Sequence, residues 1–220
     1  MGWGWYAGYF LLAAADWLAV GQYRQNLRII TKPTTMLVLI AGFSLAGGWA
    51  GQGYWFGMGL VLSLLGDIFL LMPPGFFIFG LAWFLLAHLF YIIGFNQGLP
   101  IISWTQILLV LFFVVFDAWG YLRLRRAILS RPSGRRIRYP LLFYILVITI
   151  MVLSALSTLF RADWPLQSAV LVSLGALLFF ASDFTLANDR FVGPIKNGRL
   201  IVIVTYHLAQ ALICSAVLLR

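Results

Sequence analysis

Two aspartates lie inside long apolar stretches of this chain. Asp67 stands near the end of the run 56–72, and Asp183 stands near the end of the run 166–187. A charged side chain within a bilayer costs at least ~2.5–3.5 kcal/mol and therefore faces the interior of a helix bundle. Two buried carboxylates in different protonation states can serve as a general acid and as a stabiliser of positive charge. We therefore expect chemistry at Asp67 and Asp183.

The composition excludes a soluble globular protein. Of the 220 residues, 63% are hydrophobic and only 10% are charged, whereas soluble domains have ~45–50% apolar and ~25% charged residues. The mean hydropathy is +0.98. The single cysteine, Cys214, excludes an internal disulfide and a multi-cysteine metal site. The composition is typical of a polytopic helical membrane protein.

The apolar runs predict the fold. A spanning helix needs ~20 mainly apolar residues, within a range of ~17–25. Runs of this kind, separated by Gly, Pro or charged residues, occupy positions 4–20, 34–50, 56–72, 76–95, 101–122, 139–160, 166–187 and 200–219. We predict an all-α bundle of eight transmembrane helices with short loops, forming one domain over residues 1–220.

The basic residues predict the orientation of this bundle. Thirteen of the fifteen Lys and Arg residues fall at the ends of odd-numbered spans, and only Arg161 and Arg220 fall on the other side. Positive residues mark the cytoplasmic side, so both termini should be non-cytoplasmic. The basic run 123–138 is interpreted as a cytoplasmic loop that attracts anionic lipid rather than as an RNA-binding arm. We expect an integral protein of a bacterial cytoplasmic (inner) membrane and no nucleic-acid partner.

This orientation brings four carboxylates to one layer of the membrane. Asp67 and Asp183 lie near the cytoplasmic ends of their spans, and so do Asp16 and Asp117. We expect one pocket open toward the cytoplasmic leaflet. For Asp16 and Asp117, which are closer to helix ends and to arginines, a structural role is favoured.

Polar residues on other spans could complete such a site. His88 and Tyr91 share one stripe of the run 76–95, and Tyr206 and Gln210 are one turn apart on the last span. Gly66, beside Asp67, leaves room for a neighbouring helix. The alternative for each polar residue is a hydrogen bond between helices without a chemical role.

Metal and cofactor signals are weak. Two histidines exclude a three-histidine zinc site, although histidine and aspartate ligands together could hold a metal ion. His88 and His207 could ligate haem, but nothing else in the sequence marks such a site. We expect neither a metal nor a cofactor.

An ordered set of these residues points to a family. It comprises Lys32-Pro33 before the second span, Gly66-Asp67, Phe76, Gly80, His88, Tyr91, Ser182-Asp183, Tyr206 and Gln210. On these residues the sequence resembles the YhhN-like lysoplasmalogenase family. The resemblance implies an eight-helix enzyme that hydrolyses the vinyl ether bond of lysoplasmalogens to a fatty aldehyde and glycerophospho-ethanolamine or -choline. It also implies catalysis by Asp67 and Asp183 without a metal.

The chemistry of the residues fits this implication. A vinyl ether is cleaved when a proton reaches its alkene carbon and water captures the resulting oxocarbenium ion, as in glycoside hydrolysis. The residues do not assign the acid to either aspartate. We expect supporting or substrate-binding roles for Lys32, His88, Tyr91, Ser182, Asn188, Tyr206 and Gln210.

The expected partner is a lysophospholipid that enters from the bilayer, among other membrane lipids and without a soluble protein partner. Lys32 is the first candidate for its phosphate, ahead of Arg190, Lys196 and Arg199. The alternative for these residues is that they only set the orientation in the membrane.

Two other function classes remain open. A small proton-coupled transporter could use the same aspartates as a relay, although no inverted repeat is evident and Asp67 and Asp183 are not at the midplane. A membrane scaffold without activity would leave four converging carboxylates unexplained.

Overall fold

The computed structural model describes residues 4–98, 104–130 and 134–220. These residues form helices, turns and irregular segments, and none of them lies in a strand. The eight α-helices are α1 (Trp5–Gly21), α2 (Gln25–Leu45), α3 (Gly53–Leu71), α4 (Phe77–Phe95), α5 (Trp104–Leu129), α6 (Gly134–Ser157), α7 (Leu166–Phe191) and α8 (Gly198–Leu218). Short 3₁₀ turns precede α4 (Pro74–Phe76) and follow α6 (Thr158–Phe160). The all-α prediction is confirmed.

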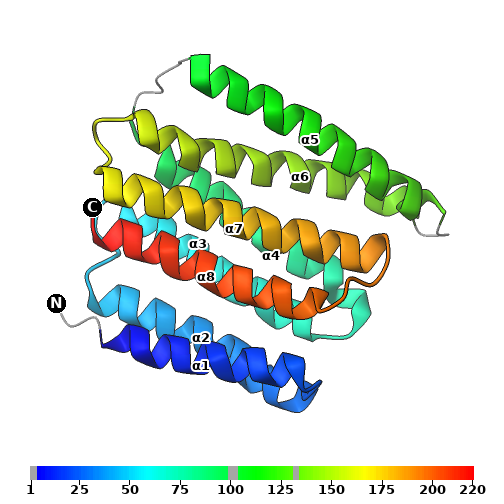
Figure 1. Ribbon diagram of the computed structural model, residues 1–220. Helices are drawn as coiled ribbons and strands as arrows, with labels where there is room; N and C mark the ends of the chain where they lie inside the picture. The colour runs from blue at the N-terminus through cyan, green and yellow to red at the C-terminus, as the bar shows by residue number, and fades with distance from the viewer. Residues whose placement is uncertain (1–3, 99–103, 131–133) are drawn as a thin grey trace.

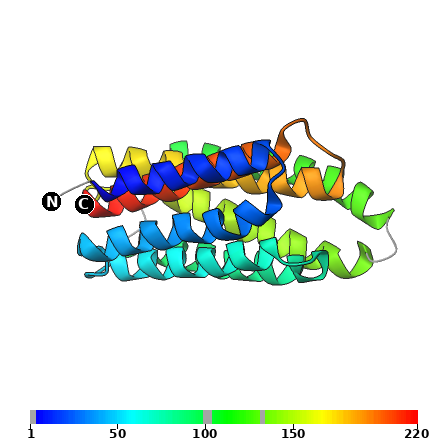
Figure 2. The same cartoon turned by 90° about the horizontal axis from the view of Figure 1, so that it is seen from below.

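The helices run roughly parallel or antiparallel to one another (Figure 1), and α1 begins at the same end of the bundle at which α8 finishes. Seen at right angles, α1, α7 and α8 form one layer and α2, α3 and α4 form the other (Figure 2). Helix α6 contacts both α4 and α7 and thus joins the layers along one edge. Helix α5 packs on α6 and α7 at the outside of the bundle (Figure 1).

Seven of the described helices, α2 to α8, are long and apolar enough to cross a membrane. Helix α1, with 17 residues, is shorter but packs along α2 and α8. Large apolar side chains such as Leu108, Phe112 and Val115 on α5 are exposed on the surface. In a bilayer they contact lipid, so the chain is an integral membrane protein. Which side of the membrane each end faces stays a prediction.

The second helix starts earlier than the sequence pattern predicts. It begins at Gln25 rather than at position 34, so Lys32 and Pro33 lie inside it. The charges that lowered the hydropathy of this segment are paired in the fold: Lys32 with Asp67, and Arg28 close to Asp16. Because those partners come from α1 and α3, the local sequence could not indicate that this segment is helical.

The basic run 123–138 is not a loop, which corrects the sequence interpretation. Helix α5 continues to Leu129 and α6 begins at Gly134, so most of the run is helical. These two helix ends extend beyond the rest of the bundle (Figure 1). The predicted start of the fifth span, at 101–103, lies outside the described residues.

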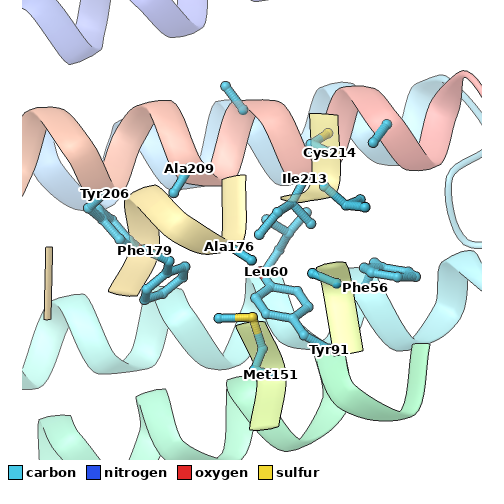
Figure 3. Close-up of a cluster of buried hydrophobic side chains, with 14 of the residues drawn as sticks. Phe56, Leu60, Tyr91, Met151, Ala176, Phe179, Tyr206, Ala209, Ile213 and Cys214 are labelled. Carbon is cyan, nitrogen blue, oxygen red and sulfur yellow. The ribbon is translucent and has the colours of Figure 1, made fainter. Parts of the chain in front are cut away.

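The core between the layers is aromatic and tightly packed. Figure 3 shows Phe56, Tyr91 and Phe179 among the side chains that fill it. Helices α3 and α4 approach closely at Gly66, where an added Cβ would lie 2.6 Å from a Phe84 ring carbon. The predicted space-making role of this glycine is therefore present in the fold.

Candidate functional site

Asp67 is fully buried and paired with groups from two other helices. Its Oδ1 lies 2.8 Å from the Nζ atom of Lys32 on α2. Its Oδ2 accepts a 2.7 Å hydrogen bond from the Tyr206 hydroxyl on α8. The Lys32 ammonium also lies 5.8 Å from the centre of the Tyr206 ring. These contacts hold α2, α3 and α8 around one buried ion pair.

Asp183 has a different set of partners. Its Oδ2 accepts a 2.5 Å hydrogen bond from the Tyr144 hydroxyl on α6 and lies 3.5 Å from Nε2 of His88 on α4. Both contacts use Oδ2, and Oδ1 has no hydrogen-bond or ion-pair partner among the described residues. The Asp183 side chain is 13% exposed, whereas that of Asp67 is fully buried. Asp183 is therefore the more accessible of the two carboxylates.

The proton on His88 can be assigned from its neighbours. Its Nδ1 lies 2.5 Å from the backbone oxygen of Phe84, which can only accept, so Nδ1 carries a hydrogen. Nε2 then holds a proton only if the ring is cationic. The ring therefore presents Nε2 to the Oδ2 atom of Asp183 at 3.5 Å.

An aromatic ring separates the two aspartate groups. The centre of the Phe179 ring lies 5.4 Å from that of Tyr206 and 4.7 Å from that of His88. Figure 3 shows Phe179 beside Tyr206. No hydrogen bond or ion pair joins Asp67 to Asp183 among the described residues. The two carboxylates therefore belong to one region but not to one hydrogen-bonded dyad.

A second polar contact extends the Asp67 group into the core. The Tyr91 hydroxyl donates a 2.7 Å hydrogen bond to Oε1 of Gln210. Gln210 is one turn after Tyr206 on α8, and all three side chains are buried. Tyr91 of the fourth span is thus brought together with Gln210 and Tyr206 of the eighth span near Asp67, whereas His88 lies beside Asp183.

The four carboxylates form two groups instead of sharing one pocket. Asp16 accepts a 2.7 Å hydrogen bond from Thr31 and lies 4.0 Å from Arg28, on the Asp67 side. Asp117 accepts a 2.6 Å hydrogen bond from Thr149 and lines the same pocket as Asp183. The sequence expectation of a single shared pocket is therefore wrong, because side-chain partners on each helix decide where each carboxylate points.

The pocket beside Asp183 is almost entirely apolar. It lies between α4, α5, α6 and α7 and encloses a cavity of about 40 Å³. Its lining includes Asp117, Tyr144 and Asp183 as polar groups, with Leu81, Phe116, Leu124, Leu141, Ile145, Ile148, Phe180, Phe184 and Phe191 among the apolar ones. Its apolar wall matches the chemistry of a lipid chain.

The other predicted site residues lie apart from this pocket. Ser182 donates a 3.0 Å hydrogen bond to the backbone oxygen of Val202 and so ties α7 to α8. Asn188 donates to the Phe184 backbone oxygen within α7 at 2.8 Å. His207, which is not one of the predicted site residues, accepts a 3.0 Å hydrogen bond from Trp17. No group of three or more His, Cys, Asp or Glu residues that could hold a metal ion occurs in the described part of the chain.

Tyr144 and Thr149 were not predicted from the sequence; they are the two α6 side chains that donate hydrogen bonds to the carboxylates of Asp183 and Asp117. The available signal was weak: each is a polar residue within the apolar run 139–160. Polar groups in such a run often bond to another helix. Only the packing of α6 against α5 and α7 reveals their partners.

Comparison with known proteins assigns the family. The family model described as the YhhN family matches residues 27–217. The chain belongs to the YhhN family. The residues that suggested this family from sequence lie on α2, α3, α4, α7 and α8, apart from Phe76, which lies in the 3₁₀ turn before α4.

Several curated relatives carry a named activity. Lysoplasmalogenase TMEM86A of Bos taurus is 31% identical over 71% of this chain and 62% of its own length. Lysoplasmalogenase TMEM86B of Mus musculus is 30% identical over 96% of this chain and 81% of its own length. A lysoplasmalogenase homolog of Dictyostelium discoideum is 29% identical over 80% of this chain. The match therefore spans less than two thirds of the first of these YhhN-family relatives. No solved structure matches the chain.

Proposed function

We propose that this YhhN-family protein is an intramembrane hydrolase that cleaves the vinyl ether bond of lysoplasmalogens. The products are a fatty aldehyde and glycerophosphoethanolamine or glycerophosphocholine. The observation that carries the proposal is the position of Asp183 at an apolar pocket between α4, α5, α6 and α7, beside Tyr144 and His88. The names of the relatives support the same substrate class.

The reaction needs one proton and one water molecule. A proton moves from the acid to the alkene carbon that is not bound to oxygen, and the other alkene carbon becomes an oxocarbenium ion. Water adds to this cation and gives up a proton, forming a hemiacetal. The hemiacetal collapses to the aldehyde and the free glycerol hydroxyl. In this balance no oxidant, reductant or metal is consumed.

We assign Asp183 as the acid. The alkenyl chain would lie in the apolar pocket, which brings the vinyl ether next to the Asp183 carboxyl. His88, whose Nε2 lies 3.5 Å from Oδ2 of Asp183, can return the proton between turnovers. The Tyr144 hydroxyl orients the carboxyl group by its hydrogen bond.

We assign Asp67 the ionised role. The Lys32 ammonium at 2.8 Å favours a negative charge on Asp67. That charge lies beyond the Phe179 ring, in surroundings of low dielectric where its field acts over a longer distance than in water. It would lower the energy of the cation that forms beside Asp183.

The test is aldehyde release by the purified protein from a lysoplasmalogen in detergent or nanodiscs. The matched control lipid carries a saturated alkyl ether, which this mechanism cannot cleave. In D₂O the aldehyde, trapped at once, should carry one deuterium on the carbon next to its carbonyl. Solute flux in proteoliposomes without aldehyde release would instead favour the transporter.

Single substitutions distinguish the roles of the aspartates. Asp183→Asn and Asp67→Asn should each abolish aldehyde release while thermal unfolding remains cooperative. Asp117→Asn is the matched control, because Asp117 lines the same pocket as Asp183 and accepts a hydrogen bond from Thr149, whereas His88 lies beside Asp183. Loss of activity in Asp117→Asn, with full activity in Asp67→Asn, would transfer the second role to Asp117.

A further inference from the structure

A second pocket lies at the basic end of the bundle, away from Asp183. It is formed where α1 ends, α2 begins and α8 begins, three segments at the same end of the bundle in Figure 1. Its lining residues are Ala19, Val20, Tyr23, Gln25, Arg28 and Arg199. Two guanidinium-bearing side chains thus line one recess that has no acidic residue in its wall.

Arg28 is partly buried, and its guanidinium group has a donor without a hydrogen-bond partner. Its side chain is 17% exposed, and its nearest carboxylate oxygen, Oδ1 of Asp16, is 4.0 Å away. That oxygen already accepts a hydrogen bond from Thr31. The buried Nε atom of Arg28 has no hydrogen-bond partner. A buried donor without an acceptor costs ~1–3 kcal/mol, so this group is suited to an oxygen ligand.

Arg199 approaches the same recess from α8. It is the second residue of that helix and is exposed. Within the described chain it makes no hydrogen bond or ion pair, and its charge acts on Arg28. Two like charges at one recess repel each other, and an anion between them converts this repulsion into attraction. The planar guanidinium fork matches the oxygens of a phosphate group.

The recess lies about one turn of α2 away from the ion pair of Lys32 and Asp67. Arg28 and Lys32 are four residues apart on α2 and therefore share one face of the helix. Four residues correspond to ~6 Å along the helix axis. Lys32 itself is buried and paired with Asp67, so Arg28 and Arg199 are better placed than Lys32 to reach a group at the surface.

We propose that the recess of Arg28 and Arg199 binds the phosphate group of the lysophospholipid headgroup. The proposal rests on the function proposed above and adds the subsite that recognises the headgroup. Headgroup and chain then have separate sites: the phosphate at the basic end of α1, α2 and α8, and the chain in the apolar pocket. A lipid without phosphate loses the first of these contacts.

The experiment measures equilibrium binding of a labelled alkyl ether analogue of the lysolipid to the purified protein in nanodiscs of zwitterionic lipid. The analogue is not cleaved, so binding is read independently of catalysis. The same alkylglycerol without phosphate serves as the comparison ligand. Wild-type protein should bind the phosphate-bearing analogue at least about tenfold more tightly, the size of one hydrogen bond to a charged group.

Arg199→Gln should remove this tenfold preference. Arg125→Gln is the matched control, because Arg125 is an exposed arginine near the end of α5, outside the recess, and the substitution removes the same charge. Arg28→Gln leaves Asp16 without its neighbouring cation, so Arg28→Lys is the second variant; it keeps the charge, loses the planar fork and should weaken the preference. An unchanged preference in Arg199→Gln, or an equal loss in Arg125→Gln, would overturn the proposal.

Inorganic phosphate, rather than a lipid headgroup, could also supply the phosphate group that binds in the recess. If millimolar inorganic phosphate leaves binding of the analogue unchanged, the recess is a lipid-headgroup site. If inorganic phosphate binds wild-type protein and not Arg199→Gln, while the analogue binds no more tightly than the alkylglycerol, the recess takes the free anion and the lipid assignment is overturned. Absence of aldehyde release with an intact phosphate preference would contradict the hydrolase and leave this subsite standing.

Discussion

The Nζ atom of Lys32 lies 2.8 Å from Oδ1 of Asp67, and both side chains are almost completely buried. The pair joins α2 to α3 in the apolar interior of a membrane protein. A buried ion pair contributes little to stability by itself, because desolvation offsets the attraction between the charges. Removing one partner is different, since it leaves the other charge buried without compensation.

The first prediction concerns this pair. Lys32→Met should lower the free energy of unfolding by ~3–5 kcal/mol, the usual cost of an uncompensated buried charge. Thermal unfolding in detergent measures it, with Lys196→Met as the control at an exposed lysine. The double variant Lys32→Met, Asp67→Leu should recover part of the loss. Equal unfolding temperatures for the two single variants would contradict the prediction.

The second prediction concerns the apolar pocket. Ala187 lines it from α7, so Ala187→Phe should fill part of its space. If the alkenyl chain lies there, kcat/KM for a long-chain lysoplasmalogen should fall at least about tenfold relative to a short-chain one. Ala181→Phe adds the same ring on the exposed face of α7 and should leave this ratio unchanged. The same ratio in both variants would show that the chain binds elsewhere.

The third prediction concerns the contact of α3 with α4. In Gly66→Ala the new methyl group would lie 2.6 Å from the Phe84 ring, which is closer than atoms can approach, so the ring must move. Such overpacking costs ~1–3 kcal/mol. Gly75→Ala is the control, because no atom lies within 4 Å of its added Cβ. Denaturation of both variants tests the difference, and a Gly66→Ala protein as stable as Gly75→Ala would refute it.

The fourth prediction concerns pH at the end of the bundle opposite the basic recess. Arg161 donates hydrogen bonds of 2.9 and 2.7 Å to the two oxygens of Asp163, and Arg220 donates another of 3.1 Å. The hydrogen bonds from Arg161, followed by the positive charges of both arginines, lower the pKa of Asp163 below its ordinary value. The pairing therefore stabilises the fold above pH ~3.9, the pKa in the unfolded chain. This contribution is lost as pH falls through the lowered pKa.

Asp163→Asn should accordingly unfold at a lower temperature than wild type at pH 6, and this difference should shrink toward pH 3. The effect should stay below ~1 kcal/mol, because the side chain is 42% exposed and water screens its charge. A difference between the two proteins that is constant from pH 6 to pH 3 would argue against a stabilising charge on Asp163.

The fold class and the number of helices could be predicted from the amino-acid sequence. Transfer of a segment into a bilayer depends on the local run of apolar side chains, and the eight runs all contain helices in the structure. The resemblance to the YhhN family was also recognised from the sequence, because the residues that suggest this family occur in order along the chain. The start of α2 at Gln25 did not follow, because its charges are compensated by partners on α1 and α3.

The grouping of the carboxylates could not be predicted without the packing of the helices. Asp67 and Asp183 look equivalent in sequence, yet one is paired with Lys32 and the other faces an apolar pocket beside Tyr144. Hydrogen bonds between helices join residues as far apart in the chain as Asp67 and Tyr206, and no local pattern encodes them. Helix α5 lies at the periphery of the bundle and forms one wall of that pocket. Its position is likewise a consequence of packing between segments that are distant in the chain.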